Sequence, residues 1–269
     1  MELVCQADSL AGAQAAADNG ADCIHLEYTA QSEHGFLCDA IRYAHENGRK
    51  VVVELNMPSH SFTWKERCEI IDSAAATRVD AIVFSDPALL LYASANHRHV
   101  QLHYRLSDCP AASGSIDLFY QRYGISRVVL PSILTLPQVE RMSSSTSVEL
   151  QVVGFGNPCA ILEAPDCEDD AGAGTPGAVI GLGPDLQGAS VECCAGSEAA
   201  ANDGWYSGTP SPDNDALRFL PRLRNIGVRA IKIEAQRGNP ARLAEITRIW
   251  RDAMDRSLRG PQHYAVTPA

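Results

Sequence analysis

Eight short runs rich in β-branched residues, separated by helix-like stretches, constrain the fold of this chain more than any other feature. They cover residues 2–5, 23–27, 50–56, 80–85, 100–106, 127–131, 148–154 and 230–235. Several of the stretches between them end in Gly or Asn just before the next run, which is typical of helix C-termini. Eight strand-helix units in 269 residues predict an α/β fold, a TIM-type (β/α)8 barrel that spans residues 1–269 as one domain.

The alternation breaks once, after the seventh run. Residues 157–212 are rich in Gly, Pro, Asp and Ala and carry no clear periodicity. A segment this long without regular structure is unusual inside a compact domain and is commonly functional or disordered. It follows the carboxyl end of a strand, which is the face where TIM-type barrels place their active sites. We therefore predict that residues 157–212 form an insertion that contributes to function.

Composition limits the classes of function. The net charge is −11 and the acidic residues are spread along the chain, so binding to duplex nucleic acid is not expected. The sequence shows neither a secretory leader nor an apolar run of about 20 residues that could span a membrane, and we expect a cytoplasmic protein. In a reducing compartment the nine cysteines are not expected to form a disulfide framework, and those that cluster are expected to bind metal or serve redox chemistry.

Polar residues placed two apart near the strand ends should share one face, because side chains alternate along a strand. The pairs are His25 with Glu27, Glu54 with Asn56, His103 with Arg105, and Lys232 with Glu234. If they point inward, the upper barrel carries a charged layer suited to a small polar or anionic substrate. The alternative that these residues form internal ion pairs, or face the helices, stays open.

Five of these residues are predicted to be catalytic or substrate-binding: Glu54, His103, Arg105, Lys232 and Glu234. His103 is the expected proton carrier, since imidazole titrates near neutral pH. Arg105 is expected to clamp a substrate carboxylate, because its planar guanidinium donates two parallel hydrogen bonds.

Four segments carry a resemblance to a known family. They are ELVCQADSLAGAQAAADNGAD (2–22), VDAIVFSDPALL (79–90), GISRVVLPSILTLPQVERM (124–142) and GVRAIKIEAQRGNPARLAEITRIWRDAMD (227–255). In this order they resemble signatures of the collagenase-like peptidase family. That family includes the oxygen-independent ubiquinone-biosynthesis proteins and the tRNA and 23S rRNA hydroxylation proteins.

The resemblance implies a barrel with a cysteine-ligated 4Fe-4S cluster that hydroxylates a small molecule or RNA base without molecular oxygen, with a prephenate-like oxygen donor. The ligands it implies are Cys159, Cys167, Cys193 and Cys194, all within the predicted insertion. Soft thiolates suit iron-sulfur clusters, and zinc accepts the same ligands. Cys109 is an alternative ligand.

This chain departs from the family pattern in several places. Cys193 and Cys194 are adjacent where relatives separate them, Ser132 stands where an Arg is expected, and Gln236 precedes Arg237 where an Arg often follows Lys-Ile-Glu. The chain is a divergent member by this comparison. The alternatives are a collagenase-like peptidase or other hydrolase, for which no Ser/His/Asp or Cys/His signature is recognisable, and a cluster-free or zinc-stabilised binding barrel. A protein partner is compatible with each of these functions.

The remaining cysteines are expected to be structural. Cys5 and Cys23 fall on predicted strands, and Cys38 and Cys68 fall on predicted helices. Free cysteine in such positions usually behaves as a small buried hydrophobic residue.

Overall fold

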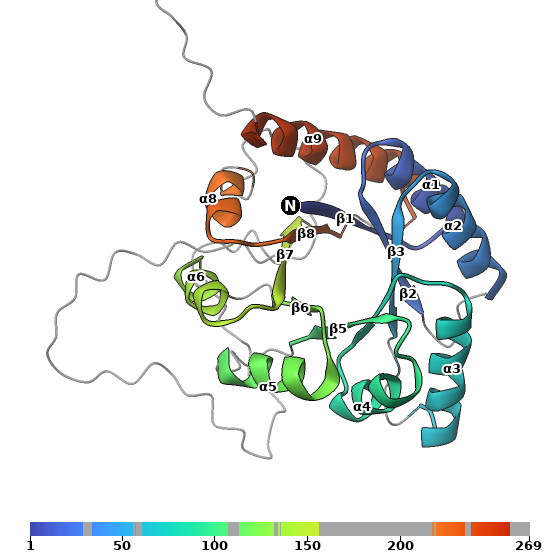
Figure 1. The fold of residues 1–269 in the computed structure, drawn as a ribbon. Helices are drawn as coiled ribbons and strands as arrows, with labels where there is room; N and C mark the ends of the chain where they lie inside the picture. The colour runs from blue at the N-terminus through green and yellow to red at the C-terminus, as the bar shows by residue number, and fades with distance from the viewer. Residues whose placement is uncertain are drawn as a thin grey trace, which may run out of the picture. The chain divides into compact units, whose positions relative to one another are not determined.

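All eight predicted strands are present in a computed structural model of the chain, and they close into one barrel (Figure 1). The structure describes residues 1–28, 34–55, 57, 61–106, 113–131, 134, 136–155, 217, 219–234 and 238–258. The strands are β1 (Glu2–Ala7), β2 (Cys23–Tyr28), β3 (Lys50–Leu55), β4 (Ala81–Phe84), β5 (Gln101–Arg105), β6 (Arg127–Val129), β7 (Glu149–Phe155) and β8 (Ala230–Ile233).

Each strand pairs in parallel with the next, and β8 pairs with β1, which confirms the predicted barrel and its strand order. The bounds differ from the predicted ones by a few residues. The largest differences are at the carboxyl ends of β1, β6 and β8. Of these, β6 ends at Val129 although the apolar run continues to Pro131. Proline has no N–H to donate to a strand ladder, so the run is longer than the strand.

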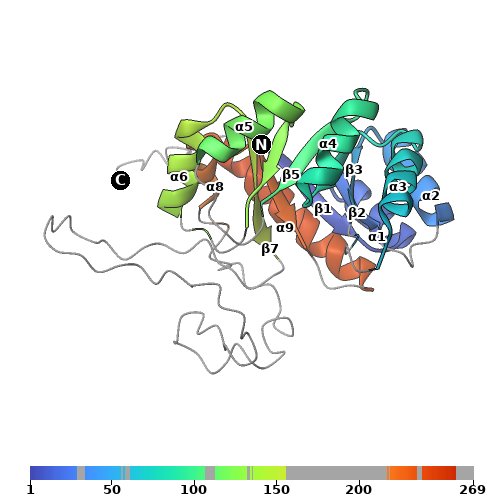
Figure 2. The same cartoon turned by 90° about the horizontal axis from the view of Figure 1, so that it is seen from below.

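Helices follow the strands and lie outside the barrel (Figure 1, Figure 2). They are α1 (Leu10–Asp18), α2 (His34–Glu46), α3 (Trp64–Ala76), α4 (Pro87–Asn96), α5 (Ser113–Tyr123), α6 (Leu136–Ser145), α8 (Leu220–Asn225) and α9 (Pro240–Leu258). Local signals begin several of them. Thr63 and Glu66 form a reciprocal capping box at α3, and the side chain of Asp86 accepts a hydrogen bond from the backbone of Ala88 at α4.

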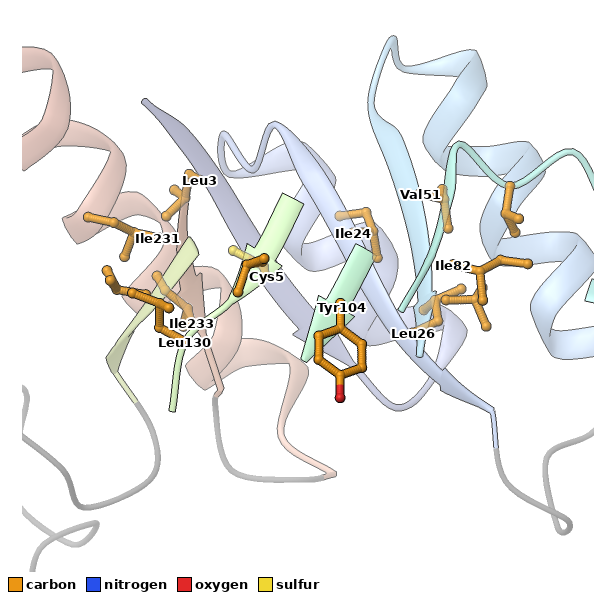
Figure 3. Close-up of a cluster of buried hydrophobic side chains, with 14 of the residues drawn as sticks. Leu3, Cys5, Ile24, Leu26, Val51, Ile82, Tyr104, Leu130, Ile231 and Ile233 are labelled. Carbon is orange, nitrogen blue, oxygen red and sulfur yellow. The ribbon is translucent and has the colours of Figure 1, made fainter. Parts of the chain in front are cut away.

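Alternation along the strands sorts the buried side chains into two clusters. The larger cluster packs between the barrel and the helices, and Figure 3 draws part of it, including Leu3 of β1 and Ile231 of β8. The smaller cluster consists of inward-facing side chains: Val4, Cys23, Val52, Ala81, Val83, Val129 and Ala230. The interior is therefore filled by small side chains in its middle, and polar residues occupy both of its ends.

The carboxyl end of β7 contains a bulge where its pairing with β8 shifts between Val153 and Phe155. Gly154 lies at this shift. A Cβ atom there would come within 2.5 Å of Ile231 Cγ2 and 2.6 Å of Trp250 Cη2. Only glycine allows β7 to approach α9 this closely, and the residues that follow the bulge are those of the predicted insertion.

The described residues all belong to one compact unit, which is made of residues 1–163 and 213–269. Residues 164–212, which hold most of the predicted insertion, lie outside the described ranges, so the insertion and the single-domain assignment stay predictions. Within the described ranges, no helix combines the length and the apolar composition that crossing a bilayer requires.

Candidate functional site

A pocket of about 510 Å³ lies at the carboxyl ends of the strands. Its volume is in the range of pockets that hold small molecules. It is lined by Gln6, Glu27, Glu54, Leu55, Met57, Phe84, Ser85, Asp86, Leu89, Arg105, Lys232 and Glu234. The position agrees with the face on which barrels of this type carry out chemistry.

Glu54 is the centre of a hydrogen-bonded network beneath the pocket. Arg105 donates from Nε to Glu54 Oε1 and from Nη2 to Glu54 Oε2, each at 2.6 Å. His25 Nε2 lies 2.9 Å from the same Oε2, and Lys232 Nζ lies 3.8 Å from it. These contacts join β2, β3, β5 and β8 through one carboxylate.

The network keeps Glu54 ionised. Burial by itself raises the pKa of a carboxyl group, but hydrogen bonds from His25 and Arg105 outweigh it and hold the pKa of Glu54 well below its usual range. A carboxylate with so low a pKa and so many donors around it is a poor general base. Its geometry instead fixes the positions of the side chains that surround it.

His25 is buried and neutral. Burial and the nearby Lys232 charge lower the pKa of His25 to about 4. Neutral imidazole carries one N–H, and the contact with the Glu54 carboxylate requires that proton on Nε2. Within the described part of the chain, His25 Nδ1 is buried without a hydrogen-bond partner.

Lys232 and Glu234 form a second pair along β8. Lys232 Nζ lies 2.8 Å from Glu234 Oε1, and the Lys232 side chain is only 1% exposed. Burial lowers the pKa of Lys232, and the charges of Glu234 and Glu54 oppose that effect. An ammonium with a lowered pKa can release a proton more readily than an exposed lysine can.

His103 lies deeper than expected. It was predicted to line the upper barrel beside Arg105, but it is not among the residues that line the pocket. Its ring is 3% exposed and its position pairs with Arg127, two residues nearer the amino end of β5 than Arg105. Burial and the Arg127 charge hold the pKa of His103 well below its ordinary value. The inward orientation of His103 was predicted correctly. Its depth along the barrel axis depends on the stagger between strands, which the alternation of residues in the sequence does not reveal.

Arg105 lines the pocket as predicted and forms an ion pair within the protein. The fork expected to clamp a substrate carboxylate is turned to Glu54. The alternative of an internal ion pair therefore describes the observed contact, with Arg105 and Glu54 side chains 27% and 14% exposed. Asn56, the residue predicted to share its face with Glu54, lies outside the described ranges.

A second ionic cluster occupies the opposite, amino-terminal end of the barrel. Arg127 lies 2.6 Å from Glu2 and 2.7 Å from Glu149, and Lys50 lies 3.1 Å from Glu2. These residues stand at the first position of their strands, where the amino-terminal face of such barrels serves stability rather than chemistry. This cluster was not predicted from the sequence. Its members could have been recognised there as charged residues at the first position of a strand.

Three polar residues of the pocket were also not predicted from the sequence. Gln6, Ser85 and Asp86 stand at the carboxyl ends of β1 and β4 and line the pocket. Their place at strand ends was visible in the sequence. Asp86 also accepts from Arg67 at 3.1 Å, so its charge is partly compensated.

The predicted cluster ligands Cys159, Cys167, Cys193 and Cys194, and the alternative ligand Cys109, lie outside the described residues. Of the cysteines that are described, Cys5, Cys23 and Cys68 are buried as expected, whereas Cys38 is exposed, contrary to the expectation that it packs in the core. The described residues include no group of three or more metal-ligating side chains that could hold an ion.

Comparison with known proteins places the chain in a family. The model of peptidase family U32 matches residues 8–164 and 199–268. The chain belongs to peptidase family U32. Among curated U32-like relatives, the tRNA hydroxylation protein P2 of Bacillus subtilis is 24% identical over 234 residues, which cover 84% of this chain and 74% of that protein.

Two other relatives are longer than the region they share with this chain. The 23S rRNA 5-hydroxycytidine C2501 synthase of Escherichia coli is 22% identical over 263 residues, covering 95% of this chain and 39% of the synthase. An uncharacterized protease of Methanocaldococcus jannaschii is 28% identical over 166 residues, covering 58% of this chain and 40% of the protease.

Solved structures agree on the fold. A tryptophan synthase structure from Mycobacterium tuberculosis superposes with a TM-score of 0.55 at 10% identity, covering 94% of this chain and 92% of that chain. The orotidine 5'-phosphate decarboxylase of Pyrococcus horikoshii gives a TM-score of 0.50 at 9% identity, covering 94% and 99%. At such identities the likeness shows the barrel and carries no information about activity.

Proposed function

We propose that this U32 family member is a modifying enzyme that hydroxylates a small polar molecule or an RNA base in the cytoplasm, without using molecular oxygen. The main support for the proposal is the polar pocket at the carboxyl ends of the strands. The relatives of the chain, which include proteins named for tRNA and rRNA hydroxylation, indicate the type of reaction. A prephenate-like oxygen donor, expected from the family resemblance, is part of the proposal, and we do not assign its binding to this pocket.

The residues around the pocket divide into two roles. Glu54 holds Arg105 and His25 in place, because its two oxygens accept from both of them. Lys232 and Glu234 are the groups able to exchange a proton with a bound substrate, since the buried amine has a lowered pKa and faces the carboxylate at 2.8 Å. His103 has no direct role in this scheme.

We further propose that Cys159, Cys167, Cys193 and Cys194 hold a 4Fe-4S cluster, with Cys109 as the alternative fourth ligand. Four thiolates would satisfy the usual coordination of such a cluster. The bound cluster would supply the one-electron redox chemistry that amino acid side chains lack. Cys5 and Cys23 do not compete for this role, because they are buried within the barrel wall and interior.

The test is anaerobic purification followed by iron, zinc and acid-labile sulfide analysis. About four iron and four sulfide per chain are expected. Cys159→Ser and Cys167→Ser should each lose most of the iron, while Cys38→Ser, at an exposed position outside the cluster, should keep it. Full iron content in both ligand variants, or protein without iron and sulfide, would refute the cluster. Zinc without sulfide would support the zinc-stabilised alternative.

Activity is tested separately with unmodified tRNA and rRNA and with prephenate as oxygen donor. A mass increase of one oxygen on a nucleoside, dependent on the donor and on anaerobically prepared protein, is the expected result. Peptidase activity is the second candidate, because the family name and one relative carry that label. Cleavage of gelatin by the cysteine variants at the wild-type rate, with no oxygen transfer, would favour it.

A further inference from the structure

The charges of the pocket restrict the ligand it can hold. Among the described residues the lining contains four carboxylates, Glu27, Glu54, Asp86 and Glu234, and two cations, Arg105 and Lys232. The described lining is thus net negative at neutral pH. A pocket of one sign concentrates ligands of the opposite sign, because its walls exclude the solvent that would screen the charges.

Both cations are already held by carboxylates. Arg105 uses Nε and Nη2 on Glu54, and Lys232 lies 2.8 Å from Glu234 with only 1% of its side chain exposed. Among the described residues, Nη1 of Arg105 has no contact, but the Arg105 charge is compensated by Glu54 and the Lys232 charge by Glu234, so neither cation offers a ligand carboxylate or phosphate an uncompensated charge. A ligand that separated Glu54 from Arg105, or Glu234 from Lys232, would leave a buried carboxylate without its partner, which is costly.

Glu234 presents an open carboxylate oxygen to the pocket. Its Oε1 faces Lys232, whereas no described contact occupies Oε2, and the side chain is 21% exposed. Glu54 differs, because Arg105 and His25 engage both of its oxygens. A group that donates hydrogen bonds can therefore bind at Glu234 without breaking the network around Glu54.

The lining from β3, β4 and α4 includes four apolar side chains next to the polar Ser85 and Asp86. They are Leu55, Met57, Phe84 and Leu89, and all four are buried. Sites that bind a ring usually pack its face against apolar side chains. A nearby hydrogen-bond acceptor then binds one polar edge of the ring and fixes its orientation. Both parts of such a ligand fit within a pocket of about 510 Å³.

We propose that this pocket binds a compact ring through a positively charged or hydrogen-bond-donating edge at Glu234, with the ring face against Leu55, Met57 and Leu89. The ligand class is an amine, amidine or donor-rich ring, and small dianions are excluded from it. This inference rests on the proposed function only in taking the pocket as the substrate site. A dianionic oxygen donor would then bind to other residues of the chain.

The test uses two probes of the same shape and opposite charge, benzamidine and benzoate, with purified full-length protein. Ligand-observed NMR or calorimetry is expected to show benzamidine binding at least about tenfold tighter than benzoate, as a charge-assisted contact predicts. Raising the salt concentration should weaken benzamidine binding only modestly, because the contact is partly buried.

Glu234→Gln locates the binding. It should weaken benzamidine binding at least about tenfold, because the amide keeps the shape of the side chain and removes the charge. Glu69→Gln, which changes an exposed carboxylate on α3, is the matched control and should leave binding unchanged. Thermal melting of both variants reports whether they are folded, and the comparison of the two probes on wild-type protein does not depend on either variant.

Benzoate binding as tightly as benzamidine, or neither probe binding at 10 mM (roughly −2.7 kcal/mol by the affinity relation), would overturn the inference. Benzamidine binding that is unchanged in Glu234→Gln would overturn the assignment to Glu234. The outcome is independent of the cluster, because probe binding and iron content are measured separately. Protein that binds benzamidine but contains no iron would refute the cluster proposal alone.

Discussion

Replacing Glu54 by Gln should destabilise the barrel, because this residue joins four strands through one carboxylate. The substitution keeps the volume of the side chain and removes its charge. Arg105, which is partly buried, and Lys232, which is fully buried, then lose their common counter-ion, and Gln retains one acceptor oxygen for the two donors of Arg105.

The size of the effect follows from the burial of these groups. Removing one partner of a fully buried ion pair costs about 3–5 kcal/mol. Arg105 is 27% exposed and can regain some hydration, so we expect the lower end, about 3 kcal/mol. For a chain of this size that loss lowers the melting temperature by roughly 6–12 °C.

The effect should depend on pH in a defined direction. The pKa of Glu54 is lowered in the folded state, so the unfolded chain takes up a proton that the folded chain does not as the pH falls below 4.5, the ordinary pKa of a glutamate side chain. The stabilisation from Glu54 is therefore complete above that pH and is lost progressively below it. The difference in melting temperature between wild type and Glu54→Gln should shrink as the pH falls from 7 to below 4.

Differential scanning calorimetry or circular dichroism melting across this pH range measures both quantities. Glu69→Gln is the matched control, since its ion pair with Lys65 is exposed and contributes at most about 0.5 kcal/mol. A melting temperature for Glu54→Gln within 2 °C of wild type at pH 7 (about 0.5–1 kcal/mol by the same conversion) would show that the network does not hold the strands together. A gap that widens toward low pH would show that the sign of the linkage is wrong.

Two further predictions concern packing and thiol reactivity. Gly154→Ala should lower stability by about 1–3 kcal/mol or more, because the added methyl group meets Ile231 and Trp250 at less than 3 Å, and urea unfolding measures the loss. An unchanged unfolding midpoint would mean that β7 moves away from α9 freely. Iodoacetamide followed by peptide mass spectrometry should label exposed Cys38 and leave Cys5 unmodified, since burial raises the pKa of Cys5 to about 12. Equal labelling of the two cysteines would contradict the burial of Cys5.

The candidate site shows which features the local sequence predicts and which depend on the tertiary structure. Two-residue alternation correctly placed His25, Glu54, Arg105 and Lys232 on the inner face, because neighbouring side chains of a strand must point to opposite sides. It did not reveal how far along the barrel axis each one lies. His103 was therefore placed in the pocket although strand stagger sets it deeper, near Arg127.

Only the tertiary structure decided which charged side chains pair with one another. Arg105 and Glu54 are 51 residues apart in the chain, and Lys232 is much farther from both. Nothing local distinguishes an arginine that holds a protein carboxylate from one that would hold a substrate. The role of Arg105 is decided where β3, β5 and β8 come together. A buried cation and a buried carboxylate have both lost their water, so each pairs with the nearest opposite charge.

The sequence by itself determined the class of fold, the order of its eight strands, the inner and outer faces of those strands and the family to which the chain belongs. These properties follow from periodicity and short motifs, which are set by neighbours a few residues apart. Closure of the barrel, the stagger that separates His103 from the pocket, and the capture of Arg105 by Glu54 required the tertiary structure. They depend on contacts between residues far apart in the chain, whose energies exist only once the strands have met.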